Sequence, residues 1–476
     1  MMMIILATMM FCRTLSTSSV GYVRSREMLR ENIGNEFFDS IEDALAAGHR
    51  DVVLASGTHD AIDLRYETNV RVIGEENSVV SGGIEIPPSM FEINPTLTKR
   101  AERDVYTAKN ISRKVQIQKM KENGCVHGCS GVPTLLTFGD TNMVLARWPN
   151  LNVTNERNEY FHASNDTACG TGCVALDNTE ITRERVQAWG NETNAFIHGY
   201  FEWDWADCYR KIDSVKEDEQ FLNVTLVSKD LNPKTNMRFY ATNILNELDT
   251  PGEYYVDDES GDLHIIPPTS EDPSKWSEGP IFGLKQNVVD MSHSINVTVE
   301  NLIIKHGVVG LVGTNVSNSL IQNITAEHHS ENGILLTNSH DTTLWNSNVS
   351  HTGCGAMRVH GGDSTRLEKG NLVVRNCYVT KFALYKRTYE AGLHFSGVSN
   401  LYEGNTIIDS PHNCILGGGN EADSNTTSAV DCVFRGNVLD TCSYEAADTG
   451  AFYVCGQAGA WCSSVKCENI SFSHSV

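Results

Sequence analysis

The chain has 476 residues, 40% of them hydrophobic, so it can bury a large core and is not disordered throughout. Its 60 acidic and 37 basic residues give a formal net charge of -23. Such a surface repels phosphate backbones and anionic lipids, which excludes nucleic acid as an expected partner and disfavours polyanionic sugars unless a local basic patch overrides the field.

The N-terminus favours export. The apolar run from Met1 to Cys12 has the length of a signal-peptide core and is followed by Arg13, so we expect a leader within residues 1–35, with an alternative start as the other interpretation. Later runs fall short of the ~18 apolar residues of a membrane span. Fourteen cysteines and eleven N-x-S/T sequons favour an oxidising compartment. We therefore expect a secreted, disulfide-bonded glycoprotein that is a monomer without a membrane span.

Residues 36–93 predict a helix followed by short strands. In FFDSIEDALAA, Ser40 stands three residues before Asp43, as in a capping box, and apolar residues follow at helical spacing. From Asp51 onward, β-branched pairs alternate with Gly and Asn turns. We expect a helix that caps the open end of a solenoid, and then the first coils.

Residues 94–285 depart from this pattern and predict an inserted β-rich domain. Cys125 and Cys129 form one close pair, and Cys169 and Cys173 form another. A four-cysteine metal site is one interpretation, but we favour disulfides, either local or crossed between the pairs, without zinc. The tryptophans of FEWDWADCY at 201–209 either stack on a sugar or, as we expect, are buried aromatics of the insertion.

Residues 286–476 contain a repeat. An x-Asn-x-apolar element recurs at intervals of 22 to 32 residues, with its asparagines at Asn301, Asn323, Asn346, Asn376, Asn405, Asn437 and Asn469. A second short strand follows most copies, and Asn tolerates the left-handed turns of stacked coils. We predict an all-β fold, a right-handed parallel β-helix over 36–93 and 286–476 with a β-sandwich-like insertion. Leucine-rich repeats are excluded because no L-x-x-L-x-L consensus appears, and propellers fit poorly.

Alignment of the second strands predicts two columns of side chains. The inward column is Leu311, Ile334, Met357, Leu393, Ile415 and Phe452. The outward column is Val312, Leu335, Arg358, His394, Leu416 and Tyr453. The outward column becomes partly polar at Arg358, in the coils whose loops lengthen, and such loops are where solenoids carry function.

Acidic residues in these loops are Asp363, Glu390, Asp409, Glu421, Asp423, Glu445 and Asp448. Glycoside hydrolysis needs two carboxyl groups about 5 to 9.5 Å apart, and stacked strands lie about 4.8 Å apart. We choose Asp448 and Glu421 as the acid/base pair, with Asp409 as third candidate. The alternative interpretation of each of these acids is a solvated charge on a loop. This mechanism requires no metal or organic cofactor, and we expect none.

Five residues are candidates for binding a polysaccharide or glycan substrate: Arg358, His394, His412, Tyr453 and Asp363. Histidines can orient a carboxylate or bind a sugar hydroxyl. Lone histidines more often have a structural role, which is the alternative interpretation of His394 and His412.

Several motifs resemble those of right-handed parallel β-helix carbohydrate-active proteins, and among them a family of secreted glycoside hydrolases that includes α-L-fucosidases and xylanases. The similarity runs from about Phe37 to the end. The motifs are LARWPN at 145–150, WDWADCYRKI at 203–212, NILNELDTPGEYYVDDESGDLHIIPP from 243, VHGGD at 359–363, GVSNLYEGNTIIDSPHNCILGGGNE at 397–421 and EAADTGAFY at 445–453.

The resemblance implies a β-helix with a β-sandwich-like insertion and catalytic acids in the last coils. The chain departs from the family where Glu421-Ala422 replaces an expected Asp-His, where Ala447-Asp448 replaces an acidic doublet, and where ADSNTTSAVD is inserted. A catalytically inactive relative is therefore one alternative. The others are a polysaccharide lyase on the same fold, which would need a cation or a basic residue such as Arg358, and a carbohydrate-binding matrix protein.

Overall fold

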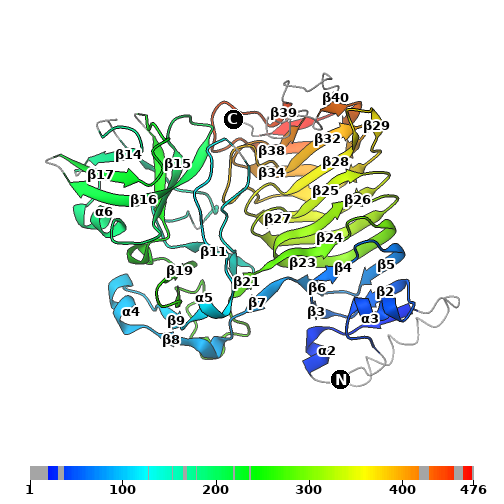
Figure 1. Cartoon of the computed structure of the whole chain (residues 1–476), viewed down its shortest axis with the longest axis horizontal. Helices are drawn as coiled ribbons and strands as arrows, with labels where there is room; N and C mark the ends of the chain where they lie inside the picture. Colours follow the sequence, from blue (N-terminus) through cyan, green and yellow to red (C-terminus); the bar gives the residue numbers. More distant parts are fainter. Residues whose placement is uncertain are drawn as a thin grey trace.

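A computed structural model of the whole chain describes residues 20–30, 37–126, 128–152, 154–163, 169–177, 179–217, 220–234, 237–417, 428–454 and 465–473. The apolar run Met1 to Cys12 of the expected leader, Glu421 and Asp423 lie outside these ranges. The protein is all-β, with 47% strand and 9% helix. A tall stack of strands stands beside a separate lobe (Figure 1).

The stack is one sheet of 26 strands, which pair almost entirely in parallel from one coil to the next. The predicted parallel β-helix is therefore confirmed. Its strands are β1 (Val20–Val23), β2 (Asp51–Leu54), β3 (Gly57–His59), β4 (Ile62–Asp63), β5 (Thr68–Gly74), β6 (Ser78–Ser81), β22 (Lys285–Asp290), β23 (Ile295–Thr314), β24 (Leu320–His329), β25 (Ile334–Ser339), β26 (Thr343–Trp345), β27 (Asn348–Thr352), β28 (Met357–Asp363), β29 (Glu368–Lys369), β30 (Val373–Arg375), β31 (Tyr378–Val379), β32 (Leu393–Val398), β33 (Leu401–Glu403), β34 (Thr406–Ser410), β35 (Ile415–Gly417), β36 (Ala429–Val430), β37 (Cys432–Arg435), β38 (Val438–Cys442), β39 (Phe452–Val454), β40 (Val465–Glu468) and β41 (Ser471–Ser473).

The register of β23, β25, β28, β32, β35 and β39 confirms both predicted columns. The inward residues from Leu311 to Phe452 stack in the expected order, and all but the partly buried Phe452 are buried in one continuous core. Since side chains alternate along a strand, the next residue of each strand points outward. The outward column therefore has the predicted membership.

The asparagine ladder is present, with one correction. Asn323 donates to Asn301 and Asn346 donates to Asn323, and each has left-handed backbone dihedrals. Beyond Asn376 this column continues with Gly404 and Gly436, at φ 65° and 60°, before Asn469.

Asn405 and Asn437 occupy the next position of their coils. Their buried side chains bond to each other there, where Asn437 Oδ1 accepts from Asn405. A single seven-membered ladder was therefore wrong at these two copies, because glycine meets the same demand for a left-handed turn.

Replacing Asn346 by alanine should lower the free energy of unfolding by about 1–2 kcal/mol. The residue has a left-handed backbone with φ 47°, which is unfavourable for alanine, whereas the short polar side chain of asparagine tolerates it. The substitution also removes the 2.7 Å hydrogen bond to Asn323. Asn346→Gly loses the bond but keeps the backbone, so it should cost less than alanine. A urea midpoint measured for both variants checks this, and an alanine variant as stable as the glycine variant would contradict it.

At the N-terminal end, α3 (Ile41–Ala46) covers the first coil beside α2 (Arg26–Arg30). The Ser40 hydroxyl accepts the backbone N–H of Asp43, as the capping signature predicts. Ile41, Ala44 and Leu45 are buried on the solenoid core, so the helix closes its open end.

The lobe contains two further sheets, and its strands occupy the chain between β6 and β22. The eight-stranded sheet consists of β7 (Gly83–Glu85), β8 (Phe91–Ile93), β9 (Tyr106–Ala108), β10 (Leu136–Phe138), β11 (Thr141–Leu145), β19 (Glu253–Val256), β20 (Leu263–Ile265) and β21 (Ile281–Gly283). The second sheet consists of β12 (Arg147–Trp148), β13 (Phe161–His162), β14 (Cys173–Asp177), β15 (Phe196–Tyr200), β16 (Asp207–Glu217), β17 (Phe221–Leu226) and β18 (Arg238–Thr242). Helices α4 (Pro95–Ala101), α5 (Ile111–Lys114) and α6 (Arg183–Trp189) lie in this part of the chain, and each sheet has its own apolar core. Within the described ranges, no helix is long and apolar enough to cross a membrane.

The disulfides differ partly from expectation. Cys169 pairs with Cys173, one of the predicted local bridges. Cys125 instead pairs with Cys208, and Cys129 with Cys354 of the solenoid, so both local and crossed pairing were wrong for these two. Close spacing in sequence does not reveal partners on distant strands. The Cys129 bridge fixes the lobe to the coil that contains β28.

Candidate functional site

The turns that precede the strands of the outward column contain a second column of side chains. Glu331, Cys354, Glu390 and His412 each stand three residues before the first inward residue of their strand, and Asp448 stands four before its own. The Cys354 N–H donates to the Glu331 carbonyl, and the Gly355 N–H to the Glu390 carboxylate, so these turns stack. With about 4.8 Å per coil, Glu390 lies about 10 Å along the stack from both Glu331 and Asp448.

Glu331, Glu390 and Arg358 form a cluster that we call the outer-face cluster. The Nη2 of Arg358 lies 3.8 Å from Oε2 of Glu390, and the same oxygen accepts the Gly355 N–H at 2.9 Å. Glu390 is only 2% exposed, while Arg358 is 27% exposed. Among the described residues, Arg358 has this one polar contact and the Glu331 carboxyl has no hydrogen bond. The guanidinium can therefore bind a ligand.

The two carboxyl groups have unusual electrostatics. Burial, and after it the negative charge of Glu390, raises the pKa of Glu331. Burial also raises the pKa of Glu390, although the Arg358 charge and the Gly355 N–H oppose it. Glu390 thus has partners that favour its charged form, whereas the Glu331 carboxyl has no hydrogen-bond partner among the described residues. This difference suits one ionised carboxylate and one protonated acid.

The histidines of the outward face are held neutral. Burial, and then the charges of Arg358 and His360, hold the pKa of His394 well below its ordinary value. Its Nδ1 lies 3.1 Å from Nε2 of His360, so one of these two nitrogens donates a hydrogen bond to the other. Burial lowers the pKa of His412 to about 4. Neutral imidazoles serve as hydrogen-bond partners for hydroxyl groups rather than as charges.

Aromatic rings of the lobe reach this end of the column. Trp203 stacks on Trp205 at 5.9 Å, Trp205 lies 5.8 Å from Tyr389, and Tyr389 contacts His412. Trp203 is 44% exposed, so the expectation of a buried aromatic was wrong for it. Exposed stacked indoles beside polar groups suit a sugar ring, the alternative interpretation of this motif.

The remaining sequence candidates are dispersed. Asp448 is exposed, in a loop whose Ala447 N–H donates to the Asp204 carbonyl. Asp409 forms an ion pair with Arg157 at 2.7 Å, on the turn column that faces the lobe. Asp363 accepts hydrogen bonds within its own turn, from Thr365. Tyr453 stacks in the outward column. The intended partner of Asp448, Glu421, lies outside the described residues, so their separation stays a prediction.

A buried polar network joins the lobe to the solenoid beside this site. Asp207 accepts from Lys386 at 2.9 Å, from His198 at 2.9 Å and from Thr388 at 2.6 Å. Glu445 accepts from Arg387 at 3.1 Å, and from lobe tyrosines including Tyr160 at 2.6 Å. Since Lys386 to Glu390 belong to one loop, this network fixes the position of Glu390.

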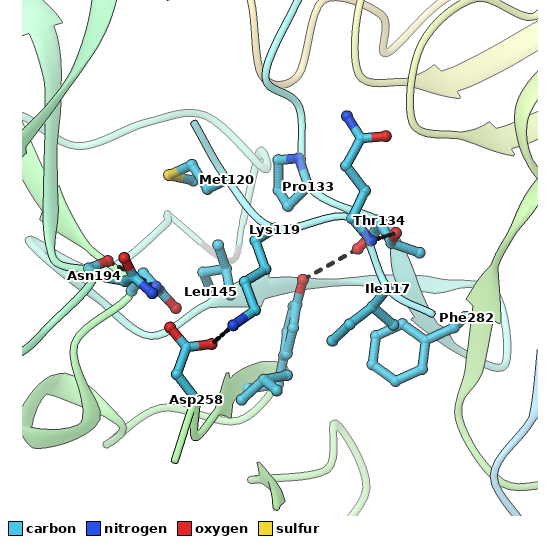
Figure 2. A pocket seen from close by; sticks show the side chains of 13 residues that line it. Ile117, Lys119, Met120, Pro133, Thr134, Leu145, Asn194, Asp258 and Phe282 are labelled. Carbon is cyan, nitrogen blue, oxygen red and sulfur yellow. Dashed lines mark hydrogen bonds and ion pairs between the residues drawn. The ribbon is translucent and has the colours of Figure 1, made fainter. Parts of the chain in front are cut away.

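A separate hollow lies within the lobe, between its two sheets. Ile117, Met120, Leu145 and Phe282 line its apolar side. Figure 2 shows Lys119 reaching across it toward Asp258, with which it forms an ion pair. None of the outer-face residues lines this hollow.

Comparisons with known proteins agree with the fold. No family model matches the chain, and no curated protein matches it in sequence. A solved structure titled "Glycoside hydrolase" aligns over 96% of this chain and 96% of its own, with a TM-score of 0.62 at 11% identity. What the two share is the fold. A complex of XylC with xylose aligns over 89% of this chain and 66% of that one, with a TM-score of 0.40 at 11% identity.

Sequence reasoning included Glu390 among the loop acids but did not select it, and it missed Glu331. Glu331 belongs to one of the short coils, whereas the candidate acids were taken from the later coils with longer loops. The available signal was its position three residues before Ile334, the same offset that Glu390 has from Leu393.

Proposed function

We propose that the protein is a secreted glycoside hydrolase that acts on a neutral or weakly charged polysaccharide, with fucosidase-like or xylanase-like substrates. The outer-face cluster is the observation that carries the proposal. Carboxyl groups with perturbed pKa values beside a partly exposed guanidinium are concentrated at catalytic sites. The fold shared with a glycoside hydrolase supports the same class.

In this proposal Glu331 acts as the general acid. Burial and the negative charge of Glu390 raise the pKa of Glu331, which favours its protonated form. Glu390 would act as base or nucleophile in its ionised form, which the Gly355 N–H and the Arg358 charge favour. The about 10 Å between their coils allows carboxyl separations within the range of glycosidases. Asp448, two coils beyond Glu390, remains the alternative partner.

Substrate would lie along the outward column and over the lobe tryptophans. Arg358 would donate to hydroxyl groups, and Trp203 and Trp205 would stack on a sugar ring. The net charge of -23 opposes polyanionic substrates. A single arginine that already faces a carboxylate neutralises a uronate poorly, so a hydrolase is favoured over a lyase.

Incubation with neutral and uronic plant and algal polysaccharides, followed by product analysis, tests the proposal. We expect saturated oligosaccharides or monosaccharides from a neutral glycan without added metal. Unsaturated products from uronates alone would establish a lyase instead. Glycan-array binding without any product would favour the matrix protein.

Replacing Trp203 by alanine should raise KM by about tenfold with little change in kcat, because ring stacking contributes of the order of 1 kcal/mol to binding. Trp345→Ala is the matched control, since Trp345 is similarly exposed on β26, away from the cluster. Initial rates over a range of substrate concentration measure both. Equal effects of the two substitutions would contradict the stacking role.

A further inference from the structure

Two histidines and a glutamate meet where the solenoid faces the lobe. Glu327 and His328 lie in the last three residues of β24, and His351 lies on β27 in the coil above. The pairing of β24 with β27 places His328 beside His351, and their rings stack at 4.9 Å. One ligand atom from each of the three residues lies within 4.8 Å of the others.

The neighbours of His328 prepare it as a metal ligand. The Asn142 Oδ1 lies 2.6 Å from its Nδ1, and since an amide oxygen only accepts, Nδ1 carries the proton. The Nε2 atom therefore keeps its lone pair. A metal-bound histidine usually donates its other N–H to such a partner, which fixes the ring.

The lobe contributes a second carboxylate. Glu156 Oε2 lies 3.9 Å from Nε2 of His351, in a loop held by the pair of Glu156 with Lys381 at 2.9 Å. Lys305 contacts Oε1 of Glu327 at 2.8 Å. A carboxylate has two oxygens, so these ion pairs leave acceptors for a cation. Glu327, His351 and Glu156 are all partly exposed, which gives a metal access.

We propose that Glu327, His328 and His351 bind a divalent transition metal such as Zn²⁺, with Glu156 as the fourth ligand. Two imidazoles and carboxylate oxygens form a common tetrahedral zinc set. Ligand atoms within 4.8 Å need to move inward only slightly to reach zinc–ligand distances of about 2.0–2.2 Å. The ion would join the solenoid to the lobe, away from the outer-face cluster.

Zinc titration of the intact, chelator-treated protein by calorimetry tests the site. We expect one Zn²⁺ per chain and at least tenfold weaker binding in His351→Asn and Glu327→Gln. Asparagine suits position 351 because its φ is 53°, and His293→Asn is the control at another histidine with a left-handed backbone, φ 62°. Position 328 is left intact because its side chain is buried.

Each outcome decides the proposal. Absence of stoichiometric binding, or equal affinity in wild type, His351→Asn and His293→Asn, would overturn it. Thermal unfolding without zinc should be unchanged in the variants, which separates ligand loss from misfolding. Glu156→Gln should also weaken binding, and an unchanged affinity there would overturn the link between lobe and solenoid. Added Co²⁺ should give the visible absorption of a tetrahedral site in wild type and in His293→Asn, but not in His351→Asn or Glu327→Gln.

Discussion

Glu390→Gln is expected to abolish glycan hydrolysis, with kcat lowered by about 10²–10⁴-fold, because a residue of this kind contributes that much when it transfers a proton or attacks. Glutamine keeps the shape and can still accept the Gly355 N–H, so the variant should fold. Glu390 is central to either pairing, since Glu331 and Asp448 both lie two coils away. Initial rates and thermal unfolding midpoints measure the two effects separately.

Two further variants identify the partner of Glu390. Glu331→Gln should match the loss in Glu390→Gln if the raised pKa of Glu331 marks the acid. Asp448→Asn should then retain activity. The reverse result would restore the pairing expected from sequence. Glu403→Gln is the control, because Glu403 pairs with Arg375 at 2.6 Å on β33, outside the cluster. A Glu390→Gln protein that is folded and active would contradict a catalytic role for the outer-face cluster.

Asp207→Asn should lower the free energy of unfolding by about 3–5 kcal/mol, the cost of leaving a buried charge without its partner. Lys386 is fully buried and loses the carboxylate that it contacts at 2.9 Å. Asp204→Asn is the matched control in the same segment. Asp204 forms an ion pair with Arg238, and the Asp204 side chain is 61% exposed. Loss of this ion pair should therefore lower the free energy of unfolding by less than about 1 kcal/mol. Denaturant unfolding midpoints compare the two.

The effect of Asp207 should depend on pH. Burial alone would raise the pKa of Asp207, but the Lys386 charge and the hydrogen bonds from His198 and Thr388 hold it well below the ordinary value. A depressed folded pKa gives stability that is fully present above the unfolded value of about 3.9 and is lost as pH falls toward the folded pKa. The difference between wild type and Asp207→Asn should therefore be largest above about pH 5 and shrink in acid. A difference that grows in acid would contradict the ion-pair account.

The solenoid was predictable because local rules determine it. Left-handed turns require Asn or Gly, and apolar residues at a fixed offset must point inward, so Leu311 to Phe452 could be aligned from sequence alone. The exchange of Asn for Gly404 and Gly436 shows the limit, since either residue satisfies the turn. The one-position shift of Asn405 follows from hydrogen bonds between coils, which sequence spacing does not encode.

The site was harder to predict because burial and partners determine its chemistry. Glu390 and Asp409 are both loop acids in sequence, yet one is buried beside Arg358 and the other is paired with Arg157 of the lobe. Trp203 of the lobe is exposed, and the docking of the lobe pairs Cys129 with Cys354. The Arg157–Asp409 and Cys129–Cys354 contacts join residues more than 200 positions apart, where no local pattern operates.

The most direct test is a crystal structure of Glu390→Gln with an oligosaccharide of the polysaccharide that wild type cleaves. The account predicts a sugar chain along the outward column, with a glycosidic oxygen within hydrogen-bond distance of the Glu331 carboxyl. Arg358 should donate to the sugar, and Trp203 should stack on a ring. A glycan bound to another face, in contact with none of these three residues, would contradict the assignment of the active site.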